Sequence, residues 1–118
     1  MRYWAARWRS IGFAWAGIRY LLTSQPNARI HAAATVAVVC LGFYLQVSRL
    51  EWVALVVAIA LVWVAEALNT GIERVVDLAS PAQHPIAAQA KDVAAAGVLL
   101  ASVAAVVIGL LVFVPQLL

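Results

Sequence analysis

Charged side chains are scarce in this sequence, where they make up 11% of 118 residues. Soluble domains carry about 25% charged residues, and a short folded chain leaves much of its surface in contact with solvent. With 66% hydrophobic residues, the chain has too little polar cover for that environment. The composition therefore excludes an ordinary soluble domain, a disordered chain and a nucleic-acid-binding module.

Cysteine and glycine are also scarce. Cys40 is the single cysteine, so the sequence excludes an intramolecular disulfide and a multi-cysteine zinc site. His31 and His84 lie far apart in the sequence, which makes a zinc site unexpected. The six glycines are scattered and form no Walker A loop. Any nucleotide would therefore have to be held by side chains and a metal ion.

Long apolar runs are the dominant feature that the sequence does contain. A helix that crosses a membrane needs about 20 predominantly apolar residues, and three segments meet this requirement. These segments are residues 27–47, 51–73 and 92–114. We expect a single membrane-embedded domain over residues 1–118, with Pro115 ending the third span.

The first 24 residues form a different kind of segment, in which tryptophans alternate with arginines. Apolar side chains recur at steps of three or four, as in one face of a helix. They are Trp4, Trp8, Ile11, Trp15, Ile18 and Leu22. Arginines beside such a face favour a helix over 1–24 that lies in the membrane interface. Packing of this helix on a cytosolic partner is the alternative. The predicted fold is an all-α membrane protein with this helix and three transmembrane helices.

The polar stretch 74–92 is expected to be a loop between the second and third spans. Two turn signals occur in it, Ser80-Pro81 and His84-Pro85. Seven of the eight lysines and arginines lie in this stretch, before the first span or at its start, and only Arg49 lies on the other side. This bias predicts that the N-terminus and the 74–92 loop are cytoplasmic.

Four polar side chains are spaced 3, 4 and 4 residues apart, so they share one helix face. They are Glu66, Asn69, Glu73 and Asp77. A carboxylate within an apolar span is costly unless it is partnered or functional, which makes Glu66 a candidate base. The oxygens of this stripe can bind a divalent cation, and Lys91-Asp92 adds a phosphate-pairing cation and another oxygen ligand. For Asp77 alone, a solvated helix-end role is favoured.

Two segments resemble motifs of a known family. The segment from Glu66 to Asp77, EALNTGIERVVD, resembles the E-x-x-N-[ST]-x-I-E-x-x-V-D signature of the prokaryotic diacylglycerol kinase/undecaprenol kinase family. The segment from Ala90 to Ala96, AKDVAAA, resembles its A-K-D-x-x-x-A element. The likeness covers nearly the whole chain and implies a homotrimeric helical bundle in the bacterial plasma (inner) membrane, with active sites shared between subunits.

The resemblance also implies a reaction, the direct transfer of the ATP γ-phosphate to a lipid hydroxyl with Mg²⁺. Glu66 would be the general base, and Glu73 would hold the metal. Asn69 would contact metal or phosphate, while Lys91 and Asp92 would engage the ATP phosphates and position the metal. This implied chemistry agrees with the demands of phosphoryl transfer, which are mainly positioning and charge neutralisation.

Further site residues carried by the resemblance are Phe13 and His84 for the nucleotide, Arg29 and Ala95 for the lipid, and Gln25 for the metal. Arg29 has the alternative role of anchoring its helix at the interface. Where the family often has a metal-binding glutamate, this chain has Gln25, whose amide oxygen is an uncharged ligand. A catalytically weakened homologue is therefore an alternative to the active kinase.

The lipid and the class of protein are separate questions. The segment from Asn27 to His31 and the His84-Pro85 pair look more like the undecaprenol kinase branch than the diacylglycerol branch, so undecaprenol is the favoured substrate. A small transporter that uses Glu66 as a proton or cation site is the remaining alternative. It has no need for Lys91 and Asp92 beside the cytoplasmic face.

Overall fold

The computed structural model describes all 118 residues and contains four helices and no strand. The helices are α1 (Arg2–Ser24), α2 (Pro26–Tyr44), α3 (Arg49–Ala79) and α4 (Pro85–Leu117). By length and composition, α2, α3 and α4 can each cross a membrane. The prediction of an all-α fold with three apolar spans and a separate N-terminal helix is thus confirmed.

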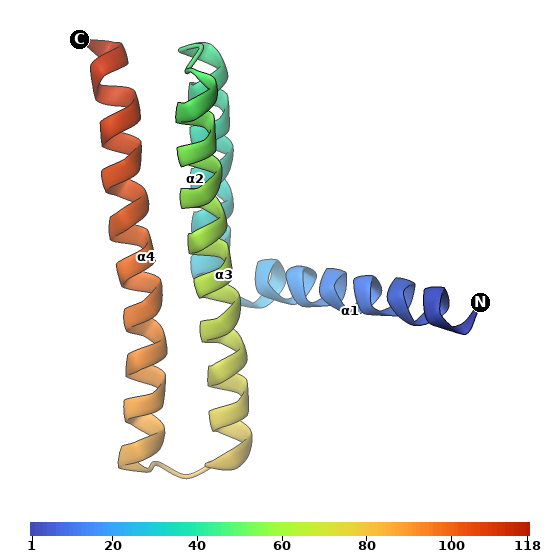
Figure 1. Cartoon of the computed structure of the whole chain (residues 1–118). Coiled ribbons are helices and arrows are strands. Elements are labelled where there is room, and N and C mark those ends of the chain that lie inside the picture. The colour runs from blue at the N-terminus through green and yellow to red at the C-terminus, as the bar shows by residue number, and fades with distance from the viewer.

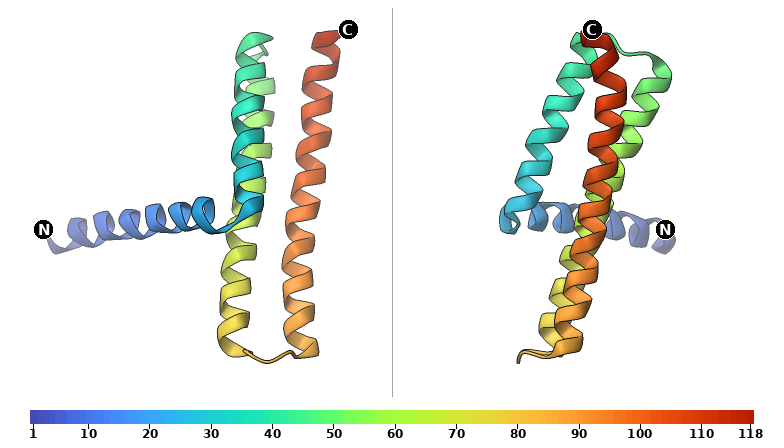
Figure 2. Two further views of the ribbon diagram at one scale, coloured as in Figure 1. Left: turned by 180° about the vertical axis from the view of Figure 1, so that it is seen from behind. Right: turned by 90° about the vertical axis from the view of Figure 1, so that its left-hand side faces the viewer.

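The helices differ in direction and in length. Helices α2, α3 and α4 run alongside one another, while α1 projects crosswise from the start of α2 (Figures 1 and 2). At 1.5 Å per residue, the 19 residues of α2 span about 28 Å and the 31 residues of α3 about 46 Å. Because α2 and α3 meet at the 45–48 connection, the excess length of α3 extends past the level of α1 (Figure 1).

Local sequence signals set the helix boundaries. Gln25 is extended, and Pro26 begins α2 at a position where its missing N–H costs nothing. Ser48 and Glu51 form a reciprocal capping box at the start of α3, with the Glu51 N–H donating to Ser48 Oγ at 3.2 Å. At the start of α4, His84 Nδ1 accepts the Ile86 N–H at 3.1 Å.

Several expected helix boundaries were wrong. Helix α2 ends at Tyr44, three residues before the expected end of the first span, because the chain turns at 45–48. The stretch 74–92 is mostly helical, because α3 continues to Ala79 and α4 begins at Pro85. Polar side chains do not break a helix, and only the turn residues between these ends do so. Pro115 does not end α4, which continues to Leu117. A proline removes one backbone hydrogen bond, and apolar helices tolerate this loss.

Few side chains are buried within one chain: 13 of 118 residues. One small cluster lies at the end of the bundle near the 45–48 connection, formed by Val47, Leu55, Val112 and Phe113. Most large apolar side chains of the three long helices face outward. In a membrane, lipid or other protein chains can cover these faces, so the molecule has no need for a larger core of its own.

Gly42 of α2 lies directly against a side chain of α3. A Cβ at this position would lie 2.6 Å from the Trp52 ring, whose centroid in turn lies 4.8 Å from that of Phe43. We expect Gly42→Ala to destabilise the protein by about 1–3 kcal/mol, because the packed ring has little room to move. Thermal unfolding in detergent measures this effect. Gly109→Ala is the matched control, since nothing lies within 4 Å of a Cβ there.

Candidate active site

Glu66 lies on α3 at the point where α2 begins. Its side chain is 1% exposed, and its Oε2 lies 3.4 Å from Nε2 of His31 on α2. No hydrogen bond is made to Oε2. A buried carboxylate with an unsatisfied oxygen is energetically costly, and such groups concentrate at functional sites.

Two more buried oxygens on α3 lack hydrogen-bond partners, Asn69 Oδ1 and Thr70 Oγ1. Asn69 Nδ2 donates to Glu73 Oε1 at 3.3 Å, which leaves the amide oxygen free. As their spacing predicts, Glu66, Asn69 and Glu73 follow one another along α3. Asn69 and Glu73 are in contact. Glu73 lies two turns, about 10 Å, beyond Glu66.

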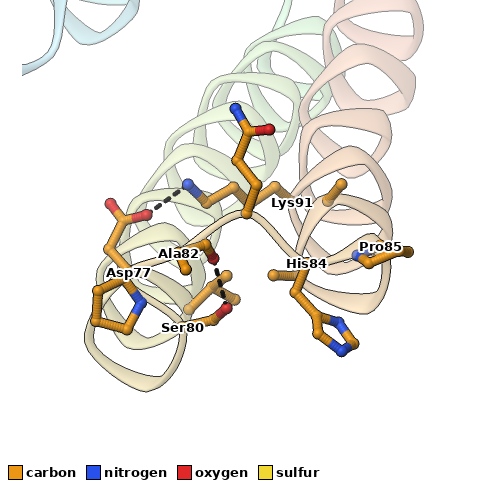
Figure 3. Close-up of a pocket in the computed structure, with 11 residues that line it drawn as sticks. Asp77, Ser80, Ala82, His84, Pro85 and Lys91 are labelled. Atoms are coloured by element: carbon orange, nitrogen blue, oxygen red, sulfur yellow. Dashed lines mark hydrogen bonds and ion pairs between the residues drawn. The ribbon is translucent and has the colours of Figure 1, made fainter.

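Lys91 and Asp77 form an ion pair between α4 and α3 (Figure 3). The pair borders a pocket of about 620 Å³ that is also lined by the 80–84 connection. His84 lines this pocket, but its imidazole is directed away from the ion pair (Figure 3). Asp92 is exposed beside Lys91. The pair is exposed, which agrees with a role for Asp77 as a helix-end residue that orders the connection and also contacts the candidate phosphate ligand Lys91.

The remaining candidates lie on other elements than the Glu66–Glu73 stripe. Gln25 lies at the α1–α2 junction, where its amide nitrogen donates to Ser24 Oγ at 3.5 Å. Phe13 is 75% exposed on α1, and Ala95 is exposed on α4.

Arg29 has a clear structural role at the α1–α2 junction. Its Nε donates to the Leu22 carbonyl at 3.0 Å, and its Nη2 donates to the Thr23 carbonyl at 2.6 Å. These bonds satisfy carbonyls at the end of α1, where helices leave them unpaired. Of the two roles open for Arg29, helix anchoring is the one that these contacts support.

His31 is the neighbour of Glu66 that motif reasoning did not find. A second contact between the same helices lies one turn further along α2, where Trp63 Nε1 donates to Thr35 Oγ1 at 3.0 Å. The sequence feature from which both contacts could have been predicted is the short 45–48 connection. It makes α2 and α3 antiparallel, so residues at similar distances before and after it lie side by side.

The donor set fits a nucleotide-bound magnesium ion better than a metal held by protein alone. No three His, Cys, Asp or Glu side chains cluster closely enough to form a metal site. Glu73 and the free Asn69 oxygen supply a carboxylate and a carbonyl, which are ligands that Mg²⁺ accepts. Mg²⁺ commonly binds one or two carboxylates and completes its shell with substrate phosphates and waters.

Comparison with known proteins agrees with the motifs. The model of the family described as prokaryotic diacylglycerol kinase matches residues 12–113. The chain is 39% identical over 109 residues to the undecaprenol kinase of Bacillus subtilis, covering 92% of this chain and 89% of that protein. It is 41% identical over 110 residues to a diacylglycerol kinase of Synechocystis sp., covering 92% of this chain and 63% of that protein.

A third relative is the diacylglycerol kinase of Escherichia coli strain K12, 31% identical over 99 residues, with 84% of this chain and 81% of that protein covered. The family match and the names of these relatives indicate a membrane lipid kinase, and a kinase of this kind uses ATP as its co-substrate. The chain belongs to the prokaryotic diacylglycerol kinase family.

Proposed function

We propose that the protein transfers the γ-phosphate of ATP to the hydroxyl of undecaprenol at the cytoplasmic face of the bacterial inner membrane. The observation that carries this proposal is the buried, unsatisfied carboxylate of Glu66 at the level where α1 meets the bundle. Glu66 is 17 residues from the start of α3, about 26 Å along a helix axis. In a hydrocarbon core of about 30 Å, that depth is just inside one interface.

The position of α1 supports this depth of Glu66 in the membrane. Near the end of α1, Leu21 is buried, and the Arg74 guanidinium lies 5.8 Å from the Tyr20 ring centroid. An amphipathic helix in the interface plane fixes the membrane surface at this height of α3. A lipid hydroxyl reaches that surface with its chain still in the bilayer, while Glu73 and Lys91 lie further toward the cytoplasm.

The chemistry needs one proton acceptor and several positioning groups. As the lipid oxygen bonds to the γ-phosphorus, its proton passes to a Glu66 oxygen and the bond to ADP breaks. Lys91 would bind the phosphates, with Asp77 holding the lysine amine, and Asp92 would engage them through the metal that it helps to position. Asn69 and Glu73 would hold Mg²⁺, which neutralises phosphate charge when bound. Gln25 would add an uncharged oxygen from the α1–α2 junction.

The subunit arrangement belongs to the same proposal. The outward apolar faces of the long helices and the exposure of Phe13 support a homotrimer with shared sites. A neighbouring subunit would then contribute to the lipid and nucleotide contacts of each site.

The test of the function is phosphate transfer from γ-labelled ATP in detergent–lipid micelles, with undecaprenol and diacylglycerol offered separately. We expect label mainly in undecaprenyl phosphate. The 39% identity to an undecaprenol kinase over 89% of that protein supports this choice. Label mainly in phosphatidic acid would assign the chain to diacylglycerol instead. Absence of label from both lipids, in a folded oligomer, would contradict the kinase proposal.

A further inference from the structure

We propose that His31 is a positioning residue that orients the Glu66 carboxylate for proton abstraction. The inference rests on the proposed function, because it gives a second residue to the base assigned there. His31 Nε2 lies 3.4 Å from Glu66 Oε2, and this oxygen has no hydrogen-bond partner. Contacts at catalytic groups are often long in structures without substrate and shorten when the site is filled.

The side chains of α3 around Glu66 make no hydrogen bond to its Oε2. Trp63 donates to Thr35, and Asn69 donates to Glu73. The Thr70 hydroxyl, one turn beyond Glu66, has no partner and so does not bond to this oxygen. The imidazole of His31 is the donor that a neighbouring helix places beside Oε2, and a neutral histidine has one N–H to give.

The position of His31 is itself fixed by contacts on both sides along α2. Before it, Arg29 binds two carbonyls at the end of α1, and after it Thr35 bonds to Trp63 on α3. Thr35 Oγ1 also donates to the His31 carbonyl at 2.7 Å. These bonds set the rotation of α2 about its axis, so that the imidazole faces α3. A catalytic group gains from such support because small misplacements slow a reaction strongly.

The two side chains of this contact differ in how deeply they are buried. The His31 side chain is 18% exposed, whereas that of Glu66 is 1% exposed. A hydrogen bond that forms from His31 to this oxygen when the site is filled would restrain the carboxylate. Loss of this bond leaves Glu66 in place but free to rotate, so the expected defect lies in the chemical step and not in substrate binding.

Two substitutions of His31 distinguish a role in orienting Glu66 from other roles. His31→Leu removes the donor, while His31→Gln keeps an N–H donor at a similar reach. We expect His31→Leu to lower kcat by about tenfold to 100-fold, with the KM for ATP and for lipid nearly unchanged. We expect His31→Gln to keep most of the wild-type kcat.

The control is Val38→Ala, which removes packing between α2 and the core cluster without touching Glu66. It should lower the unfolding temperature and leave kcat near the wild-type value. The inference is overturned if His31→Leu keeps the wild-type kcat, or if its defect lies only in KM. It is also overturned if His31→Gln is as slow as His31→Leu, since a donor alone would then be insufficient.

Glu66→Gln, measured in parallel, separates failure of this inference from failure of the proposed function. If Glu66→Gln is inactive and His31→Leu is fully active, Glu66 remains the base and only the role of His31 is lost. If Glu66→Gln keeps the wild-type rate, the base assignment fails and the inference fails with it.

Discussion

Glu66→Gln is expected to lower kcat by about 10²–10⁴-fold, the usual contribution of a general base. Glutamine keeps the shape of the side chain but cannot accept the lipid proton. The binding of ATP should persist, because the proposed phosphate ligand Lys91 pairs with Asp77, about three helical turns along α3 from Glu66. The measurement is the initial rate of label transfer to lipid at saturating ATP.

Glu51→Gln provides a matched control, since it makes the same chemical change at the opposite end of α3. Glutamine at this position can still complete the capping box with Ser48. We expect the wild-type rate of transfer and nearly the same stability. Helix content and oligomer size should be equal in both variants. A fully active Glu66→Gln protein with this normal profile would contradict the base assignment.

Glu73→Gln is expected to have the second largest effect, a loss of at least about 100-fold at low Mg²⁺. Loss of a residue that only supports a metal ligand already costs about 10–100-fold, and Glu73 is proposed to touch the ion itself. The other proposed ligand on α3, the Asn69 amide oxygen, carries no charge. The variant would therefore offer the nucleotide-bound cation only neutral oxygens from α3. The activity of the variant as a function of free Mg²⁺ measures this effect. Partial recovery at high Mg²⁺ is the expected signature.

The complementary change is Gln25→Glu, which adds the carboxylate that many members of the family carry. If Gln25 contributes an oxygen to the same ion, the variant should reach half-maximal activity at lower Mg²⁺ than the wild type. An unchanged Mg²⁺ dependence in both variants would contradict the metal assignment of Glu73 and Gln25. Equal unfolding temperatures would show that the effects are local.

Properties that depend on neighbours along one helix could be predicted from the sequence. The spans, the break before Pro26 and the burial of Glu66 all follow from local apolar periodicity and from the cost of exposing polar groups to lipid. The contact between Asn69 and Glu73 is of the same kind, because residues four apart face the same side of a helix.

Properties that depend on how helices pair were not predictable in the same way. His31 and Glu66 are 35 residues apart, and their contact follows only once the helix register across the 45–48 connection is known. The pairing of Lys91 with Asp77 likewise required the helices to continue through most of the 74–92 stretch. Side-chain polarity alone could not show this, since a polar sequence is compatible with helix or loop.

The mismatch in length between α2 and the α3–α4 pair has a kinetic consequence. The lipid alcohol diffuses within the membrane plane, at the level where α2 begins. ATP arrives from the water beyond that plane, into which the longer α3–α4 pair extends. The rate should therefore depend on the mole fraction of lipid alcohol in the membrane or micelle, and on the bulk concentration of nucleotide. Diluting the lipid with inert detergent at constant total lipid should slow turnover, whereas diluting the whole suspension at constant ATP should leave the rate per enzyme unchanged.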